Sequence, residues 1–196
     1  MFLAIDSSLG TSVALVTLDG VALHEANSVD PRAHAERIGE LLQECFDTTS
    51  YTPKDVTHVV MGVGPGPFTG LRVGMAAAAA FSLSRGLPLL PVVSHDALGW
   101  WSEKECVVVT DARRGEVAYS VYGNHSDHRR VVGPALTTPD ALDDVLGEAR
   151  KFLRNTTSVV SATALALVAK EFLDKNLDFP PHTPLYLRAP DVTVKP

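Results

Sequence analysis

The sequence predicts an α/β fold in which a unit of three strands, a helix, a strand and a second helix occurs twice. Short β-branched segments alternate with segments of helical period, and this order, complete in the first half, recurs in reduced form in the second. The first strand of each half ends in an aspartate followed four residues later by glycine, Asp6 to Gly10 and Asp111 to Gly115. We therefore expect an N-terminal lobe of residues 1–100 and a smaller C-terminal lobe of residues 101–196.

The first half begins with three predicted strands. "FLAID" and "TSVALVTL" are separated by the short turn "SSLG", and Asp19-Gly20 is a hairpin signal that leads into "VALHEANSV". Apolar residues then recur at helical spacing from Arg32 to Phe46. "VTHVVMGV" predicts a buried strand, a helix follows the turn "GPGPFTG", and Gly86 and Pro88 end that helix before the strand "LPLLPVV".

The second half repeats this order less clearly. "CVVVTD", "EVAYSVYG" and "RRVVGPAL" predict three strands, and Pro139 begins a helix in "PDALDDVLGEARKFL". "SVVSA" predicts the fourth strand and "TALALVAKEFLDK" the final helix. A doubled βββαβα unit is the architecture of the actin-like superfamily, whose ribonuclease H-like lobes hold a nucleotide between them. A single domain with an irregular C-terminal extension is the alternative.

Composition excludes several classes of protein. The 196 residues carry a net charge of −6, which argues against a dedicated nucleic-acid binder. Cys45 and Cys106 are the only cysteines, so the chain has neither a zinc-site spacing nor a disulfide framework, and a reducing cytoplasm fits best. The N-terminus lacks the pattern of a signal peptide, and no apolar run reaches the length of a membrane span.

The turn "GVGPGPFTG" between a strand and a helix has the chemistry of an anion site. Gly64, Gly66 and Gly70 let the backbone approach a ligand, and Thr69 offers a hydroxyl near the positive end of the helix. No Gly-Lys-Ser/Thr follows, so the turn is not a P-loop, and its prolines remove two N–H donors. The alternative is a rigid connector whose glycines satisfy only the backbone.

Four segments resemble the TsaB (YeaZ) family, paralogues of the tRNA threonylcarbamoyltransferase TsaD. They are "IDSSLGTSVALV", "GVGPGPFTGLRVGMAAAAAFSLSRGLPLLPV", "DARRGEVAYSVY" and "PLYLRAPDV", in the order of that family and spread over nearly the whole chain. The resemblance implies an actin-like fold and a role in synthesis of threonylcarbamoyladenosine beside the anticodon of tRNAs that read codons beginning with A. It also implies a non-catalytic scaffold that pairs with TsaD, with the ATPase TsaE joining them.

Catalytic candidates in the sequence are weak. In the catalytic paralogue two histidines in an HxxxH arrangement hold the metal, whereas here His95 is followed four positions later by Gly99. Ser94, His95 and Asp96 are adjacent, which is poor geometry for a hydrolytic relay because neighbours in a strand point to opposite faces. The polar run His125, Asp127 and His128 is expected to be a solvated loop. We therefore predict no catalytic residue and no metal site.

Nucleotide binding by this chain alone is also weakly supported. Asp6 stands where actin-like ATPases place an acidic residue near the metal of the nucleotide, but Ser7 and Ser8 follow it in place of glycine. The second-lobe segment "VVSATALAL" lacks the glycines of an adenosine site, while Arg113 and Arg114 are candidates for contact with phosphate or RNA. The resulting degenerate nucleotide or anion site comprises Asp6, Gly64, Gly66, Thr69 and Gly70. No cofactor is required by this chain, and ATP is left to the assembled complex.

The helix after the glycine turn is apolar all round from Val73 to Phe81, although a helix on one face of a sheet should have a polar stripe. This pattern predicts a covered outer face, shared with the helix from Arg32 to Phe46. Either a partner protein or the chain's own second lobe would cover it. The predicted partner surface comprises Ala35, Ile38, Leu42, Gly74, Ala77, Ala78 and Phe81.

Two classes of function follow. The first is a scaffold subunit of the threonylcarbamoylation complex, with a TsaD-type paralogue, a TsaE-type ATPase, tRNA through the complex, and a homodimer when alone. The second is a free-standing actin-like ATPase or kinase, which the missing glycines disfavour. A metallopeptidase needs ligands that the sequence lacks.

Overall fold

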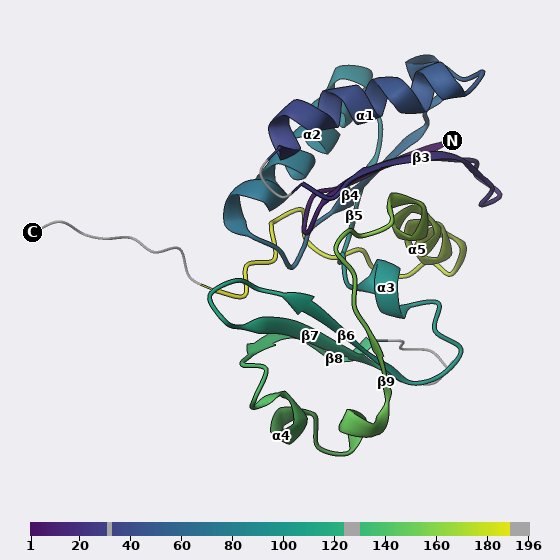
Figure 1. Ribbon diagram of the computed structural model, residues 1–196. Coiled ribbons are helices and arrows are strands. Elements are labelled where there is room, and N and C mark those ends of the chain that lie inside the picture. Colours follow the sequence, from purple (N-terminus) through teal and green to yellow (C-terminus); the bar gives the residue numbers. More distant parts are fainter. Residues whose placement is uncertain (31–32, 124–129, 189–196) are drawn as a thin grey trace, which may run out of the picture.

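The computed structural model describes residues 1–30, 33–123 and 130–188. The run His125, Asp127 and His128 lies outside these residues. Two sheets with their helices form the molecule, one above the other in Figure 1. In the described part of the chain no helix combines the length and the apolar character needed to cross a bilayer.

The first sheet has five strands in the order β3-β2-β1-β4-β5. Strands β1, β2 and β3 are antiparallel neighbours, whereas β1, β4 and β5 run parallel. All residues of β1 and β2 are buried, because both faces of the sheet are covered. The strands are β1 (Phe2–Asp6), β2 (Thr11–Val16), β3 (Ala22–Ser28), β4 (His58–Gly62) and β5 (Leu89–Val92).

Helices α1 (His34–Thr48) and α2 (Phe68–Arg85) cover one face of this sheet and α5 (Ala162–Asp174) covers the other (Figure 1). Alternate residues of β1 supply the two cores: Leu3 and Ile5 pack toward α1 and α2, and Phe2 and Ala4 pack toward α5. A short 3₁₀ turn, η1 (Pro53–Asp55), precedes β4. This layering brings the ends of β1, β4 and β5 to the edge that faces the second sheet.

The second sheet has four strands in the order β8-β7-β6-β9. Helix α3 (Asp96–Gly99) connects β5 to it, and α4 (Leu142–Leu146) with the 3₁₀ turn η2 (Gly147–Lys151) packs on its outer side. The strands are β6 (Cys106–Asp111), β7 (Val117–Tyr122), β8 (Arg130–Thr137) and β9 (Leu153–Asn155).

The order of elements agrees with the doubled βββαβα unit, but three details of the second half differ from the sequence prediction. The fourth strand is β9, whereas "SVVSA" has no strand structure. The helix predicted in "PDALDDVLGEARKFL" ends at Leu146, because Gly147 takes a positive φ of 54° and a 3₁₀ turn follows.

The third difference concerns α5, which was expected in the second lobe. Its Leu165 and Ala166 are buried against the first sheet. The physical reason is that the first sheet has a second apolar face, including Phe2, Ala4 and Val60, which α5 removes from water. The C-terminal half therefore contributes to the core of the first lobe, and the boundary at residue 100 stays a prediction.

Candidate functional site

Asp6, at the end of β1, is buried and committed to internal hydrogen bonds. Its Oδ1 accepts from the backbone N–H of Ser8 (2.8 Å) and from Ser8 Oγ (2.6 Å), and its Oδ2 accepts from Ser94 Oγ (2.5 Å). Burial raises the pKa of this carboxyl, while the bonds from Ser8 and Ser94 act in the opposite direction. Ser94 Oγ also accepts from Gly64 N–H at 3.0 Å. The carboxylate thus joins the ends of β1 and β5 to the glycine turn.

Ser7 joins the same turn to helix α2. Its hydroxyl donates to the Gly70 carbonyl at 2.7 Å and accepts from the Gly74 N–H at 2.8 Å, the two groups that an ideal helix would pair directly. A Cβ at Gly74 would lie 2.4 Å from Ser7 Oγ. Gly74 is therefore needed for close approach of β1 to α2.

The remaining glycines of the turn also contact the chain itself. Gly64 has φ +94°, and a Cβ at Gly66 would lie 2.5 Å from the Ser8 carbonyl oxygen. A Cβ at Gly70 would lie 2.7 Å from His34 Nε2, and Thr69 is exposed. These contacts support the interpretation as a rigid connector. Anion binding by these residues stays a prediction.

His95 is buried between the two sheets with both ring nitrogens in hydrogen bonds. Nδ1 lies 2.8 Å from Ser120 Oγ and Nε2 lies 2.9 Å from Thr110 Oγ1. Burial, with a smaller contribution from the Arg130 charge, lowers its pKa to about 3, so the ring is neutral. A neutral ring whose two nitrogens are both engaged has no lone pair directed to an open coordination position.

The residue four positions later, Gly99, is packed against an aromatic ring. A Cβ at this position would lie 2.3 Å from carbon atoms of Tyr122. The Tyr122 hydroxyl in turn donates to Asp96 Oδ1 at 2.8 Å, and Arg130 Nε lies 2.9 Å from the same oxygen. The space that a second histidine would need is therefore filled by Tyr122.

Ser94, His95 and Asp96 do not form a catalytic relay. Ser94 donates to Asp6, His95 contacts hydroxyls of the second sheet, and Asp96 accepts from Tyr122. Each side chain has partners of its own, although the three residues lie in the turn and the helix start after β5 and not in a strand as the sequence argument assumed. Among the described residues no group of three or more His, Cys, Asp or Glu could hold a metal ion.

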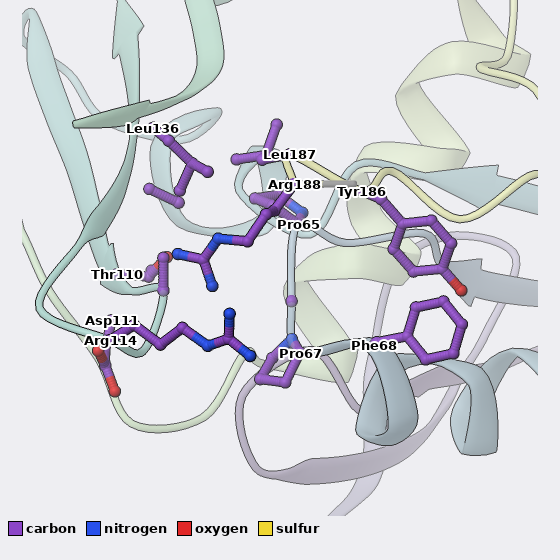
Figure 2. A pocket seen from close by; sticks show the side chains of 13 residues that line it. Pro65, Pro67, Phe68, Thr110, Asp111, Arg114, Leu136, Tyr186, Leu187 and Arg188 are labelled. Carbon is purple, nitrogen blue, oxygen red and sulfur yellow. The ribbon is translucent and has the colours of Figure 1, made fainter. Parts of the chain in front are cut away.

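A cavity of about 340 Å³ lies between the glycine turn and the hairpin of β6 and β7 (Figure 2). The glycine turn and the start of α2, the β6–β7 hairpin with Leu136 of β8, and the C-terminal segment form its walls. The sequence pointed to Arg114 as a candidate for contact with phosphate or RNA. It did not indicate that the C-terminal segment "PLYLRAPDV" lines the cavity through Tyr186, Leu187 and Arg188. The lining residues are Pro65, Gly66, Pro67, Phe68, Thr110, Asp111, Ala112, Arg114, Ala118, Leu136, Tyr186, Leu187 and Arg188.

The C-terminal segment is fixed beside this cavity. Leu185 N–H donates to the Val63 carbonyl at 2.8 Å, and the rings of Tyr186 and Phe68 stack with centroids 4.8 Å apart. The Arg72 guanidinium lies 3.8 Å from the Phe68 centroid, and its Nε donates to the Tyr186 hydroxyl. The turn, α2 and the C-terminal segment thus form one packed unit.

The predicted partner surface on α1 and α2 divides into buried and accessible residues. Ile38, Gly74 and Ala78 lie in the core beneath the helices, so the structure does not place them at a surface. Leu42, Ala77 and Phe81 are half-buried and Ala35 is exposed. The outer side of α2 also exposes Ala76, Ala79, Ala80 and Leu83, the last with 85% of its surface accessible. The described residues of the second lobe leave this face open.

Comparison with known proteins agrees with the motifs. The family model described as TsaD, tRNA N6-adenosine threonylcarbamoyltransferase, matches residues 26–183. The chain belongs to the family of TsaB and TsaD. The TsaB of Escherichia coli is 33% identical over 126 residues, which cover 61% of this chain and 54% of that protein. An uncharacterized protein of Mycobacterium tuberculosis is 39% identical over 96% of this chain and 92% of its own length.

The fold has a solved counterpart. The structure of YeaZ from Pseudomonas aeruginosa superposes with a TM-score of 0.75 at 22% identity, covering 95% of this chain and 99% of that one. This likeness confirms the actin-like fold, in agreement with the family match.

The packing of Gly99 gives a direct prediction. Gly99→His restores the HxxxH spacing but forces a side chain into the Tyr122 ring, so we expect a loss of about 3 kcal/mol in the free energy of unfolding. Gly39→His is the matched control, because nothing lies within 4 Å of a Cβ at that exposed helical position. Urea denaturation with and without Zn²⁺ measures both variants. A Gly99→His chain as stable as the control and further stabilised by zinc would contradict the packing.

The neutral state of His95 predicts a dependence of stability on pH. Between the folded pKa of about 3 and the ordinary value of 6.5, the unfolded chain binds a proton at this residue and the folded chain does not. Stability from His95 is therefore present above the ordinary pKa and is lost as pH falls. From about pH 7.5 to about pH 5 the loss should be about 2 kcal/mol.

The comparison chain is His95→Gln, which cannot titrate. Raised pKa values at Asp6 and Asp96 act in the opposite direction, but they are common to both chains and cancel in the difference. Urea midpoints at the two pH values measure the effect. Equal losses in the two chains would show that the imidazole does not stay neutral in the fold.

Proposed function

We propose that this chain is a non-catalytic subunit of the complex that adds threonylcarbamoyl to adenosine beside the anticodon of tRNAs reading codons that begin with A. The TsaB relatives are named as tRNA threonylcarbamoyladenosine biosynthesis proteins. In this role it pairs with a TsaD-type paralogue, is joined by a TsaE-type ATPase, contacts tRNA through the complex, and acts in the cytoplasm.

One observation carries the non-catalytic assignment. The position of the second metal-binding histidine of the catalytic paralogue is Gly99, and the Tyr122 ring occupies the space beside it. His95 uses both nitrogens on Ser120 and Thr110. The chemistry of metal-assisted transfer therefore belongs to the paralogue. This chain requires no cofactor of its own, and ATP acts with the assembled complex.

The outer side of α1 and α2 is the proposed docking surface. On α2 it presents alanines and Leu83 without a polar stripe, which allows another helix pair to approach closely. Apolar surface of this kind is removed from water by a second copy when the paralogue is absent, so the isolated chain forms a homodimer. A free-standing ATPase gains no support, because Asp6 serves internal contacts.

The test of this surface is Leu83→Glu compared with Leu173→Glu. Both leucines are exposed on helices, Leu83 on α2 and Leu173 on α5 at the opposite face of the sheet. A charge buried at the interface should weaken pairing at least about tenfold, whereas the same charge on α5 should leave pairing unchanged. Pull-down of the TsaD-type paralogue and light scattering of the isolated chain measure the two kinds of pairing.

Activity provides the second readout. The isolated chain with tRNA and threonylcarbamoyl-adenylate should give no modified adenosine, and addition of the paralogue should restore product for Leu173→Glu but not for Leu83→Glu. Product without the paralogue would overturn the non-catalytic role. Normal association and normal product with Leu83→Glu would overturn the docking surface while leaving the role intact.

A further inference from the structure

An aromatic ring and a guanidinium group are exposed at the start of α2. Phe68, the first residue of the helix, has 42% of its surface accessible, and Arg72 is exposed one turn later. The Arg72 guanidinium lies 3.8 Å from the centroid of the Phe68 ring, and the Tyr186 ring stacks on Phe68 with centroids 4.8 Å apart. Figure 2 shows the two rings beside one another. These three side chains form an aromatic–arginine cluster.

The packing of the cluster uses one side of the Phe68 ring. The Arg72 guanidinium lies only 5.5 Å from the Tyr186 centroid. Groups on opposite faces of one ring would be separated by two contact distances of about 3.5 Å each. The shorter separation therefore places Arg72 and Tyr186 on the same side of Phe68. Because 42% of Phe68 is accessible, a flat ligand can reach the ring from the other side.

The cation of this cluster is held in place and has no acidic partner. Arg72 Nε donates to the Tyr186 hydroxyl, and no carboxylate in the described part of the chain pairs with its terminal nitrogens. Arg188, close by in sequence to Tyr186, is paired with Glu116. Neither α2 nor residues 179–188 contain Asp or Glu, although the whole chain has a net charge of −6. The two segments that form the cluster therefore carry only positive charge.

The cluster differs in chemistry from the apolar surface farther along the same helix. Val73 to Phe81 contains no polar side chain, which suits the close approach of another protein helix. The cluster instead combines an accessible ring with a guanidinium that would be costly to enclose without an anion. A nucleotide of a single strand meets both requirements, because its base stacks on an aromatic ring and its phosphate pairs with arginine.

We propose that the aromatic–arginine cluster is a contact for single-stranded RNA, with a base stacked on Phe68 and a phosphate held by the terminal nitrogens of Arg72. Tyr186 supports the ring and orients the guanidinium. This inference rests on the proposed function, in which the RNA is the anticodon loop of tRNA. Bases in a loop are free to leave the stack, whereas the paired bases of a stem are not.

The experiment is a fluorescence anisotropy titration of a labelled anticodon stem-loop RNA. The isolated chain and its complex with the TsaD-type paralogue are both titrated, and an RNA duplex of equal length and charge serves as the ligand without unpaired bases. We expect saturable binding of the stem-loop with a dissociation constant below about 100 μM. Phe68→Leu should weaken the stem-loop at least about fivefold and leave the duplex unchanged, because only an unpaired base can stack on the ring.

Variants of charge separate the phosphate contact from stacking. Arg72→Gln should weaken the stem-loop at least about threefold and reduce the salt dependence of log affinity by about 0.7, whereas Phe68→Leu should leave the salt dependence unchanged. Arg85→Gln is the matched control, because Arg85 is exposed on the last turn of the same helix. Its affinity should change less than about twofold. Thr69→Glu adds a negative charge beside Phe68 at an exposed position and should weaken the stem-loop without removing a side chain of the cluster.

The proposal is overturned if neither the isolated chain nor the complex binds the stem-loop, or if Arg85→Gln weakens it as far as Arg72→Gln does. It is also overturned if the cluster variants bind RNA normally and lose association with the paralogue, which would make the cluster a protein contact. Failure of the proposed function has a separate signature, the absence of modified adenosine when the unaltered chain is added to the paralogue and its substrates. Loss of stem-loop binding by the isolated Phe68→Leu and Arg72→Gln chains would support the RNA contact even then.

Discussion

The buried carboxylate of Asp6 is the constraint on which the arrangement of the first lobe depends. A buried charged or polar group is tolerated only when its hydrogen bonds are made, and here Ser8 and Ser94 supply them. Because Ser94 also receives the N–H of Gly64, the ends of β1 and β5 and the glycine turn are fixed together. The start of α2, the C-terminal segment and the cavity beside them all take their positions from this junction.

The same junction supports the proposed role of this actin-like fold, in which the chain itself carries out no nucleotide chemistry. Ser7 binds the backbone of α2, and Gly66 allows the turn to lie against the Ser8 carbonyl. The Ser7 hydroxyl and the backbone of the turn, which could otherwise face a phosphate, make contacts within the chain. On the other side of the junction, His95 and Tyr122 fill the space between the sheets with hydrogen-bonded polar groups, so a buried polar network joins the two sheets.

The sequence was sufficient for the elements whose pattern is local. β-Branched runs and the Asp19-Gly20 hairpin gave the strands of the first half, and helical spacing gave α1 and α2. The sequence was insufficient for elements whose position depends on packing against distant parts of the chain. The apolar residues of α5 fit either sheet, and the three residues of β9 carry no periodic signal.

The partner surface shows the same limit. A helix as rich in alanine as α2 has no polar stripe, so its sequence cannot indicate that Gly74 and Ala78 face the sheet while Ala76 and Leu83 face outward. Likewise, no local pattern places Tyr186 beside Arg72, because their 114-residue separation is closed only by the fold. Functional residues that come from distant segments need the structure.

The central claim is that Asp6 and the glycine turn hold this chain's own backbone in place of a nucleotide. Equilibrium dialysis of magnesium-ATP against the isolated chain tests it most directly, with Asp6→Asn and Arg114→Gln measured in parallel. The account predicts no saturable binding that depends on Asp6 at nucleotide concentrations up to about 1 mM. Saturable binding that Asp6→Asn abolishes and Arg114→Gln leaves intact would contradict it.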